Sequence, residues 1–459
     1  MKNISVIKVL ICAAMLVALL SPVQTVSAGQ PTTIFEVDTF EDLVDIYPNG
    51  ICSVGDFNGG PCSLRAAIYD ATTINAAGEN VRILLPPGTY ELTQTEEGSI
   101  DAHYGDLDLQ LINDSGLELS VTIEGTGPGP SIIDARMIDR VLEIWATTAA
   151  GNKHSVILRN LEIRNGLIKS TSSDAVYGGG VYSNLVNLTV ENVRFVNNES
   201  RGRTQGESYQ SAFGGGMIAS NGNLFMTDSE FLGNKADSGS ALDLWDGATP
   251  YAYYSLVQRT SFHHNLTTGV DFPVINSHGI FYLVNSVIAQ NGSTNGTCVG
   301  VRSVGTVNIQ SSTLQKAGSG VNLNCSLSSC NIRNSALITD EMDGQIGQNC
   351  GGPSANITSE GGNVMDDNSC YPDPTLNDLV IPRENWRMSF AGKYFLPTIG
   401  SPVINHVPGQ CRAFGFYQAA YPEEGFLTVD QRQLNRDDGA CDTGSIEFQT
   451  PMFIPVIFK

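Results

Sequence analysis

The side chains best suited to chemistry gather in the middle of the chain, in the stretch "ADSGSALDLWDG" at 236–247 and shortly after it. Carboxylates facing one groove can hydrolyse a glycoside, and acids holding Ca²⁺ beside a basic residue can support a lyase reaction. An indole offers an apolar face to a sugar ring. The candidates for a ligand-binding groove are Asp237, Asp243, Trp245, Asp246, His263, His264 and His278.

The spacing and the neighbours of these residues favour a binding role over a catalytic one. Asp243 and Trp245 alternate onto the same face of a strand, and Asp246 then points the other way. No Arg or Lys recurs beside the acids as a lyase base would require, and isolated acids are expected on a chain with a net charge of −22. His263 and His264 fall on a corner, where adjacent histidines are more often solvated than metal-bound. We therefore predict no catalytic residue, no metal and no cofactor.

A repeated phrase shows which elements must position these side chains. It appears as "VILRNLEIRNG" (156–166), "LTVENVRFVNN" (188–198) and "LFMTDSEFLGN" (224–234), and weaker copies continue to residue 340. Its apolar anchors are separated by 32, 36, 31 and 25 residues and are Ile163, Phe195, Phe231, Phe262 and Val287. Repeats of this size built from short strands predict a solenoid or a propeller.

The corners between the strands favour a parallel β-helix. They are rich in Asn and Gly, and Asn tolerates left-handed backbone and can stack in hydrogen-bonded ladders between coils. Unequal repeat lengths are expected where residues loop out of a constant coil. A propeller blade needs four strands, and these periods hold fewer convincing ones. "YGGGVYSN" (177–184) and "FGGGMIAS" (213–220) occupy the same point of two successive repeats, and we interpret them as tight corners.

The stretch "GGPCSLRAAIYDA" at 59–71 predicts a capping helix for the first coil. Ser63 can N-cap it, and the apolar residues from Leu64 to Ala71 lie on one face. We expect Arg65 to point off that face and brace the cap through its guanidinium. Cys62 has no His or Asn partner of a thiol enzyme. "VRILLPPGTYELT" (81–93) follows as the first strands.

The N-terminus and the cysteines indicate export. Lys2 and Lys8, an apolar core at 9–20 and Val26-Ser27-Ala28 predict a signal peptide over 1–28. No later stretch is long enough for a membrane helix. Nine cysteines remain after position 28, and we expect the disulfides Cys52–Cys62 and Cys411–Cys441. One thiol is left over, and the unassigned cysteines are Cys298, Cys325, Cys330, Cys350 and Cys370.

Motifs at both ends of the chain resemble those of a known protein family. "CSLRAAI" at 62–68 resembles the motif of the CSLREA domain, and "FEVDT" (35–39), "LPPGTYELT" (85–93) and "VTIEGTGPGPSIIDA" (121–135) agree with its surroundings. "GSPVIN" (400–405), "DQRQLNR" (430–436) and "CDTGSIEF" (441–448) resemble the choice-of-anchor Q type of ending. The sequence departs from the family at Ala66, where Glu is usual, and at Asn405, where Asp is usual. The resemblance implies an exported bacterial protein with a right-handed β-helix of the pectin lyase-like type.

We therefore predict an all-β protein, a right-handed parallel β-helix with a short N-terminal capping helix. Its single domain spans 29–450, with a cap over 29–80, coils over 81–340 and a Cys-rich closing region over 341–450, followed by a short apolar tail at 451–459. The acidic charge argues against nucleic acid and anionic polysaccharide as partners. We expect a secreted or cell-surface monomer that binds a glycan or a cell-surface ligand. The alternative is a polysaccharide-degrading enzyme, either a pectate lyase-like enzyme or a glycoside hydrolase.

Overall fold

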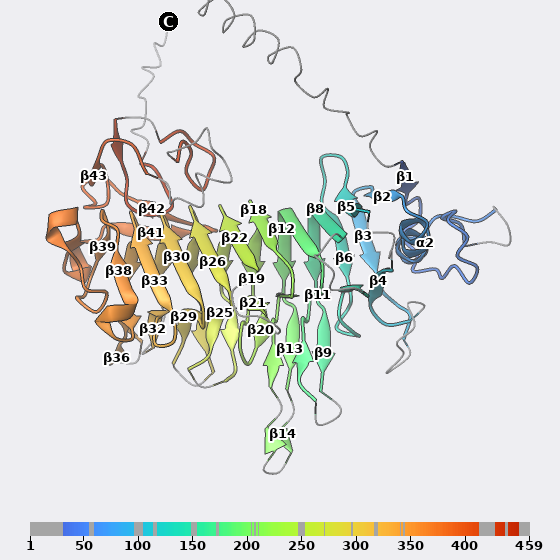
Figure 1. Cartoon of the computed structure of the whole chain (residues 1–459), viewed down its shortest axis with the longest axis horizontal. Helices are drawn as coiled ribbons and strands as arrows, with labels where there is room; N and C mark the ends of the chain where they lie inside the picture. The colour runs from blue at the N-terminus through green and yellow to red at the C-terminus, as the bar shows by residue number, and fades with distance from the viewer. Residues whose placement is uncertain are drawn as a thin grey trace, which may run out of the picture. The chain divides into compact units, whose positions relative to one another are not determined.

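Short strands of successive repeats pair in parallel and in register, and together they form three stacked sheets (Figure 1). This computed structural model describes residues 31–448 except 55–58, 96–103, 113–116, 148–153, 171–173, 203, 206–207, 210, 247–252, 270, 295–296, 316–319, 340, 343–344, 413–426 and 437–438. The expected signal peptide and the apolar tail at 451–459 lie outside the described residues. Each sheet takes its strands in chain order, which defines a parallel β-helix.

The largest sheet, sheet A, has 20 strands in two adjoining columns. They are β1 (Thr32–Glu36), β2 (Asn80–Leu85), β3 (Gly88–Glu91), β5 (Leu119–Gly125), β6 (Ser131–Asp134), β8 (His154–Arg164), β12 (Asn187–Val196), β18 (Leu224–Thr227), β19 (Glu230–Leu232), β22 (Tyr254–Gln258), β23 (Ser261–His263), β26 (Ile280–Val284), β27 (Val287–Ala289), β30 (Thr306–Gln310), β31 (Thr313–Gln315), β33 (Ser329–Arg333), β34 (Ala336–Ile338), β38 (Ile357–Ser359), β39 (Val364–Met365) and β40 (Leu379–Val380).

Sheet B continues along the stack of coils, and the shorter sheet C contributes to the middle coils. Sheet B contains β4 (Leu107–Leu111), β7 (Leu142–Ala146), β11 (Val181–Asn184), β17 (Met217–Ser220), β21 (Leu242–Trp245), β25 (Pro273–Ser277), β29 (Val299–Ser303), β32 (Val321–Asn324) and β37 (Gln348–Gly351). Sheet C contains β9 (Leu167–Lys169), β13 (Glu199–Arg201), β20 (Lys235–Ala236), β24 (Leu266–Thr267) and β28 (Gly292–Ser293). Outside them, β10 (Val176–Tyr177) pairs with β16 (Ala212–Phe213) in parallel.

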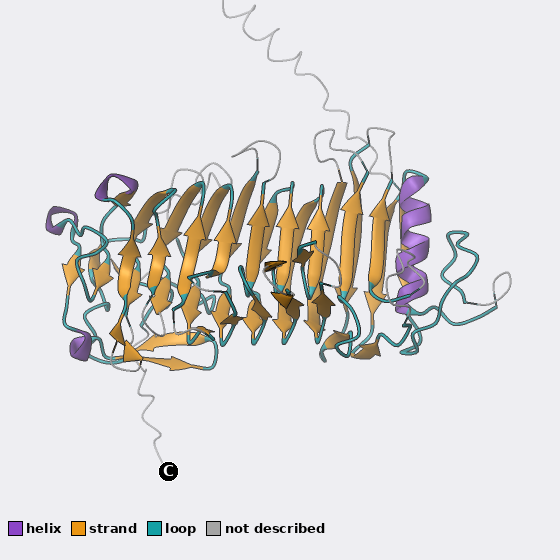
Figure 2. Cartoon of the chain, turned by 90° about the horizontal axis from the view of Figure 1, so that it is seen from below, coloured by secondary structure: helices purple, strands orange, loops and turns teal. Residues whose placement is uncertain are grey.

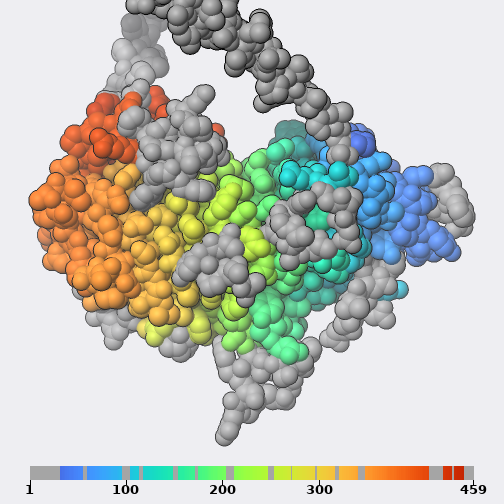
Figure 3. Space-filling model, viewed as in Figure 1, coloured from blue at the N-terminus to red at the C-terminus, as the bar shows by residue number. Residues whose placement is uncertain are grey.

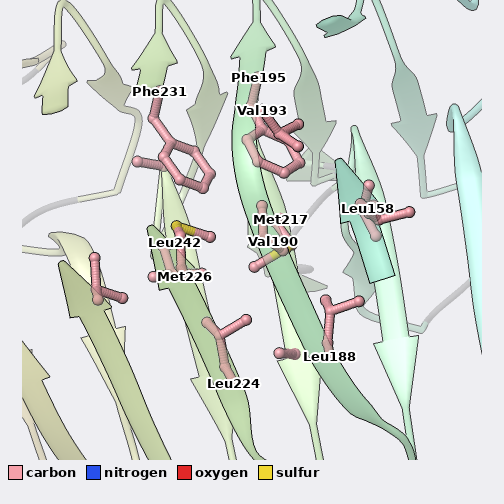
Figure 4. Packing of buried hydrophobic residues seen from close by; sticks show 14 of the residues in the cluster. Leu158, Leu188, Val190, Val193, Phe195, Met217, Leu224, Met226, Phe231 and Leu242 are labelled. Atoms are coloured by element: carbon pink, nitrogen blue, oxygen red, sulfur yellow. The ribbon is translucent and has the colours of Figure 1, made fainter. Parts of the chain in front are cut away.

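The repeated aromatic residue of the sequence forms the centre of the core. Phe195 pairs with Phe231 and Phe231 with Phe262, and their rings stack with centroids 4.5 and 4.9 Å apart. Figure 4 shows Phe195 and Phe231 inside the coil, above Leu188 of β12 and Leu224 and Met226 of β18. All three rings are fully buried. Alternation of apolar and polar residues along each strand thus fills the coil while leaving every second side chain outside.

The last anchor of the predicted repeat is wrong by one residue. Phe262 pairs with Ile288, whereas Val287 pairs with Ser261. Ile288 belongs to the main core, and Val287 instead packs in a second cluster with Trp386 and Phe395 outside the coil. A shift of one residue exchanges the two faces of a strand. Both candidates are β-branched, so side-chain type could not separate them.

A buried asparagine ladder fixes the corner between sheets A and C. Side-chain amides of consecutive coils donate to one another over 3.0 Å at each step from Asn198 to Asn234, Asn265 and Asn291. Asn234 also donates from Nδ2 to the carbonyl of Phe195, and its Oδ1 accepts the amide N–H of Asn198. The ladder therefore satisfies backbone and side chain at once, as the Asn-rich corners predicted.

The N-terminal helix α2 (Leu64–Ala76) begins as predicted and packs along the first strands (Figure 2). Ser63 accepts the N–H of Ala66, and the apolar face from Leu64 to Ala71 is buried. The expectation that Arg65 points away from the packed face is wrong, because its residue surface is only 2% exposed. Its guanidinium pairs with Asp42 at 2.7 Å and donates to two backbone carbonyls just before β4, so Arg65 holds the cap to the first coil from within.

The last described residues fold back over the outside of sheet A, where Figure 3 shows them in red beside the orange and yellow coils. They include the antiparallel pairs β41 (Met388–Ala391) with β42 (Tyr394–Pro397) and β43 (Val407–Pro408) with β44 (Ala440–Cys441). Arg436 is buried there, paired with Glu447 at 3.1 Å and donating to Asn285 of the coil. Asp442, in the acidic stretch "RDDGACD", accepts backbone N–H groups of Asn405 and Phe448, which is a structural role.

Four disulfides form among the described cysteines, in the N-terminal cap, the last coils and the closing segment. The structure forms Cys52–Cys62 and Cys411–Cys441, and it pairs four of the unassigned cysteines as Cys325–Cys330 and Cys350–Cys370. Among the described cysteines, Cys298 is buried and takes part in none of these disulfides. Four disulfides indicate an oxidising compartment. Within the described ranges, no helix has the length and apolar character needed to cross a membrane.

Candidate functional site

The outer face of sheet B carries most of the chemistry-bearing side chains. Strand pairing aligns one outward position of successive coils into a row whose members are Asp108, Glu143, Tyr182, Ile218, Asp243, Asn276 and Arg302. The flanking residues of the same strands, such as Leu109, Leu242 and Val301, lie in the core. The period of two in each strand therefore concentrates polar groups on one outer surface.

Five rings run across the coils on this side of the molecule, and we call them the aromatic track: Tyr182, Tyr177, Phe213, Trp245 and His278. In that order their neighbouring ring centroids lie 6.2, 5.7, 6.3 and 4.6 Å apart. Tyr177 and Trp245 are the most open, 37% and 39% exposed. Since coils repeat at about 4.8 Å, the track spans roughly three coil spacings.

Glycine corners position the first part of the track. Tyr177 and Phe213 pair with each other immediately before the two Gly-Gly-Gly phrases. Gly214 has a φ of +65°, and a Cβ there would lie 2.8 Å from the Cβ of Ile218. Only glycine lets the chain turn this tightly onto the next strand. Asp237 accepts the N–H of Ala212 at 2.8 Å and so fastens the residue before Phe213.

Trp245 borders a shallow hollow of about 10 Å³ that is open to solvent. Its lining includes Trp245, Tyr253 and Asp246, together with Ser255 and Ser277, which pair with the core residues Leu224 and Leu244. The exposed indole of Trp245 beside it offers an apolar face to the C–H groups of a sugar.

A hydrogen-bond relay connects a buried acid to the Trp245 ring. The residue surface of Asp243 is 0% exposed, and Asn276 Nδ2 lies 3.2 Å from both its carboxylate oxygens. The same Nδ2 lies 3.2 Å from His278 Nε2, and the His278 ring rests on Trp245. Burial raises the pKa of Asp243 to about 7. Burial, and then the charge of Arg302, lower the pKa of His278.

An acidic cluster lies at the other end of the row. One oxygen of each of Asp106, Asp108 and Glu143 lies within 4.8 Å of the others, a spacing that could hold a divalent cation. Arg140 already pairs with Asp106 at 2.9 Å and with Glu143, and its guanidinium lies 5.3 Å from the centre of the Tyr182 ring. Burial, followed by the charges of Asp106 and Glu143, raises the pKa of Asp108 to about 8.

The histidine pair predicted for the groove lies elsewhere, on the outer face of sheet A. His263 Nε2 lies 2.8 Å from Glu230 Oε1, and the rings of His263 and His264 pack beside Phe390 of the β41–β42 hairpin. His263 and His264 therefore lie at the interface between sheet A and the closing segment. The predicted residues that do come together are Asp243, Trp245, Asp246 and His278.

Sequence reasoning missed Tyr177, Tyr182 and Phe213, and it missed the acidic cluster with Asp108 and Glu143. A signal for the rings existed, because Tyr or Phe precedes Gly-Gly-Gly at the same point of two repeats. The acidic cluster had no such signal, since its members come from two coils and the strands β5 and β6 of sheet A lie between them in the sequence.

Fold and surface together define a parallel β-helix with an aromatic track on one outer face. No protein-family model, no curated protein and no solved structure matches the chain.

Proposed function

We propose that this protein is an exported scaffold that binds a glycan along its aromatic track. The observation that carries the proposal is the continuous row of rings from Tyr182 to His278, ending at the hollow beside Trp245. Aromatic groups contact the C–H faces of sugars, while carboxylates and amides at the margins accept and donate hydrogen bonds to hydroxyls. A rigid β-helix holds these groups at fixed spacing before the ligand arrives, which lowers the entropic cost of binding.

Two further features support an extracellular site of action. Four disulfides require an oxidising compartment, and the N-terminal motif of a signal peptide supplies a route of export. The resemblance to CSLREA-domain proteins points to the bacterial cell surface. In that setting a glycan of a host, a matrix or a neighbouring cell is the expected ligand.

Affinity electrophoresis in gels containing one polysaccharide each tests the proposal. We expect retardation of the wild-type protein by at least one neutral polysaccharide and its loss in a Tyr177→Ala, Trp245→Ala double variant. Tyr47→Ala is the matched control, because Tyr47 is a 59% exposed ring on the N-terminal cap. If no polysaccharide in a broad panel retards the wild-type protein, the proposal is contradicted.

One specific observation favours glycan hydrolysis as a second candidate function. Asp108 and Glu143 occupy adjacent strands beside Tyr182, with carboxylate oxygens within 4.8 Å. A retaining hydrolase uses two carboxyl groups about 5 Å apart, one of them protonated as the acid, and the raised pKa of Asp108 fits that role. Glu143 and Asp243 cannot form such a pair, because three strand spacings separate them by about 14 Å.

Release of reducing ends from any bound polysaccharide distinguishes hydrolysis from binding alone. A hydrolase would lose turnover in both Asp108→Asn and Glu143→Gln while still binding the polysaccharide. If the wild-type protein releases no reducing ends during prolonged incubation with a polysaccharide that it binds, the scaffold function alone remains.

A further inference from the structure

The contacts around Asn276 restrict the state of His278. An amide NH₂ group only donates, and Asn276 Nδ2 faces the two carboxylate oxygens of Asp243 on one side and His278 Nε2 on the other. The carboxyl group of Asp243 is enclosed by the Gly239 corner, where a Cβ would lie 2.8 Å from Asp243 Oδ2. The buried carboxylate of Asp243 faces the Asn276 amide, and because a carboxylate only accepts hydrogen bonds, it favours the amide nitrogen on this side.

A donor on Asn276 requires an acceptor on His278. Nε2 of the imidazole must then carry a lone pair, which places the ring proton on Nδ1 and leaves the ring neutral. This hydrogen bond holds the imidazole against Trp245, with ring centroids 4.6 Å apart and planes 32° apart. A protonated ring would place two donors, Nε2–H and the Asn276 amide, face to face.

We infer that Asn276 locks His278 as a neutral acceptor against Trp245, so that His278 is a positioning residue of the aromatic track and its protonation releases the ring. The inference rests on the proposed function for its link to ligand binding, whereas the lock itself is a property of the free protein. Acid should therefore weaken the contact between the His278 and Trp245 rings, and neutral or alkaline conditions should strengthen it.

The charged groups around His278 act on this lock in known directions. The carboxylate of Asp246 favours the protonated ring, while Arg302 on the other side and burial disfavour it. Asp243 ionises near pH 7, and its charge then binds the Asn276 amide more strongly and reinforces the lock. Both titrations work in the same direction, because each weakens the lock as the pH falls.

Fluorescence of Trp245 tests the lock without any ligand. Release of the imidazole ring uncovers the indole of Trp245 to water, so the emission that distinguishes the wild-type protein from Trp245→Phe should shift to longer wavelength as the pH falls from 8 to 4.5. The midpoint should lie below the usual histidine value of about 6.5. The transition should persist in Asp243→Asn, which removes the other nearby titration, and vanish in His278→Gln. Its absence in the wild-type protein, or its survival in His278→Gln, would overturn the inference.

Polysaccharide binding at two pH values then tests the link to the ligand. We expect the wild-type protein to bind its best polysaccharide about three- to tenfold more weakly at pH 5 than at pH 7.5, which is the loss of one ring contact. His278→Gln should bind with little difference between the two pH values. If Trp245→Ala abolishes binding but wild-type binding does not change with pH, the positioning role is wrong and the glycan site stands. If the fluorescence transition appears and no polysaccharide binds, the lock is supported and glycan binding is the claim that fails.

Discussion

Replacing Asp243 by Asn should stabilise the protein at pH 8 and leave its stability nearly unchanged at pH 4. The Asp243 carboxyl group lies under the Gly239 corner, with the neutral amide of Asn276 as its hydrogen-bond partner. Burial raises its pKa from 3.8 to about 7. An Asn side chain has the same shape, keeps an oxygen that accepts from Asn276, and carries no charge at any pH.

The sign and size of the effect follow from proton linkage. Between pH 3.8 and about 7 the folded protein holds a proton on Asp243 that the unfolded chain has released, so stability falls as the pH rises through this window. Each unit of pKa difference corresponds to about 1.4 kcal/mol. A shift of roughly three units therefore costs the wild-type protein up to about 4 kcal/mol above pH 7, a cost that Asp243→Asn removes.

Urea unfolding of both proteins from pH 4 to pH 8 measures this difference. Coils of a solenoid can unfold separately, so far-UV circular dichroism should be combined with emission of Trp245, which lies on the same strand as Asp243. Asp174→Asn, at an exposed side chain, controls for the loss of one surface charge. A stability difference that stays constant across this pH range, or an Asp243→Asn protein that is less stable at pH 8, would refute the reasoning.

Three other substitutions test the fold around the site, each by thermal unfolding against the wild-type protein. Asp70→Asn should raise the melting temperature at pH 8 more than at pH 5, because burial and the charge of Asp45 raise the pKa of Asp70 to about 7; equal shifts at both pH values would contradict this. Gly214→Ala should cost at least about 1–2 kcal/mol, since a left-handed φ of +65° strains any L side chain, whereas Gly292→Ala, whose Cβ would meet only Leu266 at 3.6 Å, should cost less. Asn234→Ala should cost about 3 kcal/mol or more, because several buried ladder groups lose their partners; a loss below 1 kcal/mol would show that the ladder is not structural.

The coil architecture follows from local sequence, which is why it could be predicted. Four successive repeats, from Phe195 to Ile288, each carry their own Phe or Ile for the core and their own Asn for the corner, so a comparison of the copies reveals the same pattern. Ser63 and the apolar face that follows it likewise specify α2 within a few residues. The incorrect choice of Val287 as the core anchor shows the limit of this reasoning. Ile288 beside it is also β-branched and apolar, and only the pairing with the neighbouring strand shows which of the two faces the core.

The candidate site depends on contacts between coils, and the sequence of a single repeat does not predict these contacts. Trp245 and His278 meet because β21 and β25 pair in one particular register. Arg65 is buried because Asp42 and two carbonyl groups near β4 surround it, although its position on the helix predicted a side chain that points off the packed face. Asp108 has a raised pKa because it is buried and because Asp106 and Glu143 crowd it, and Glu143 comes from a different coil.

Hydroxyl-radical footprinting with the best-bound polysaccharide tests the central claim most directly, because it reports on individual side chains. A glycan on the aromatic track should slow oxidation of the two most exposed rings, Tyr177 and Trp245, severalfold. It should leave Tyr47 on the cap and Tyr371 in the closing region, 59% and 48% exposed, unchanged. Protection of Tyr47 or Tyr371 without protection of Trp245, or no protection of any ring by a polysaccharide that demonstrably binds, would contradict the account.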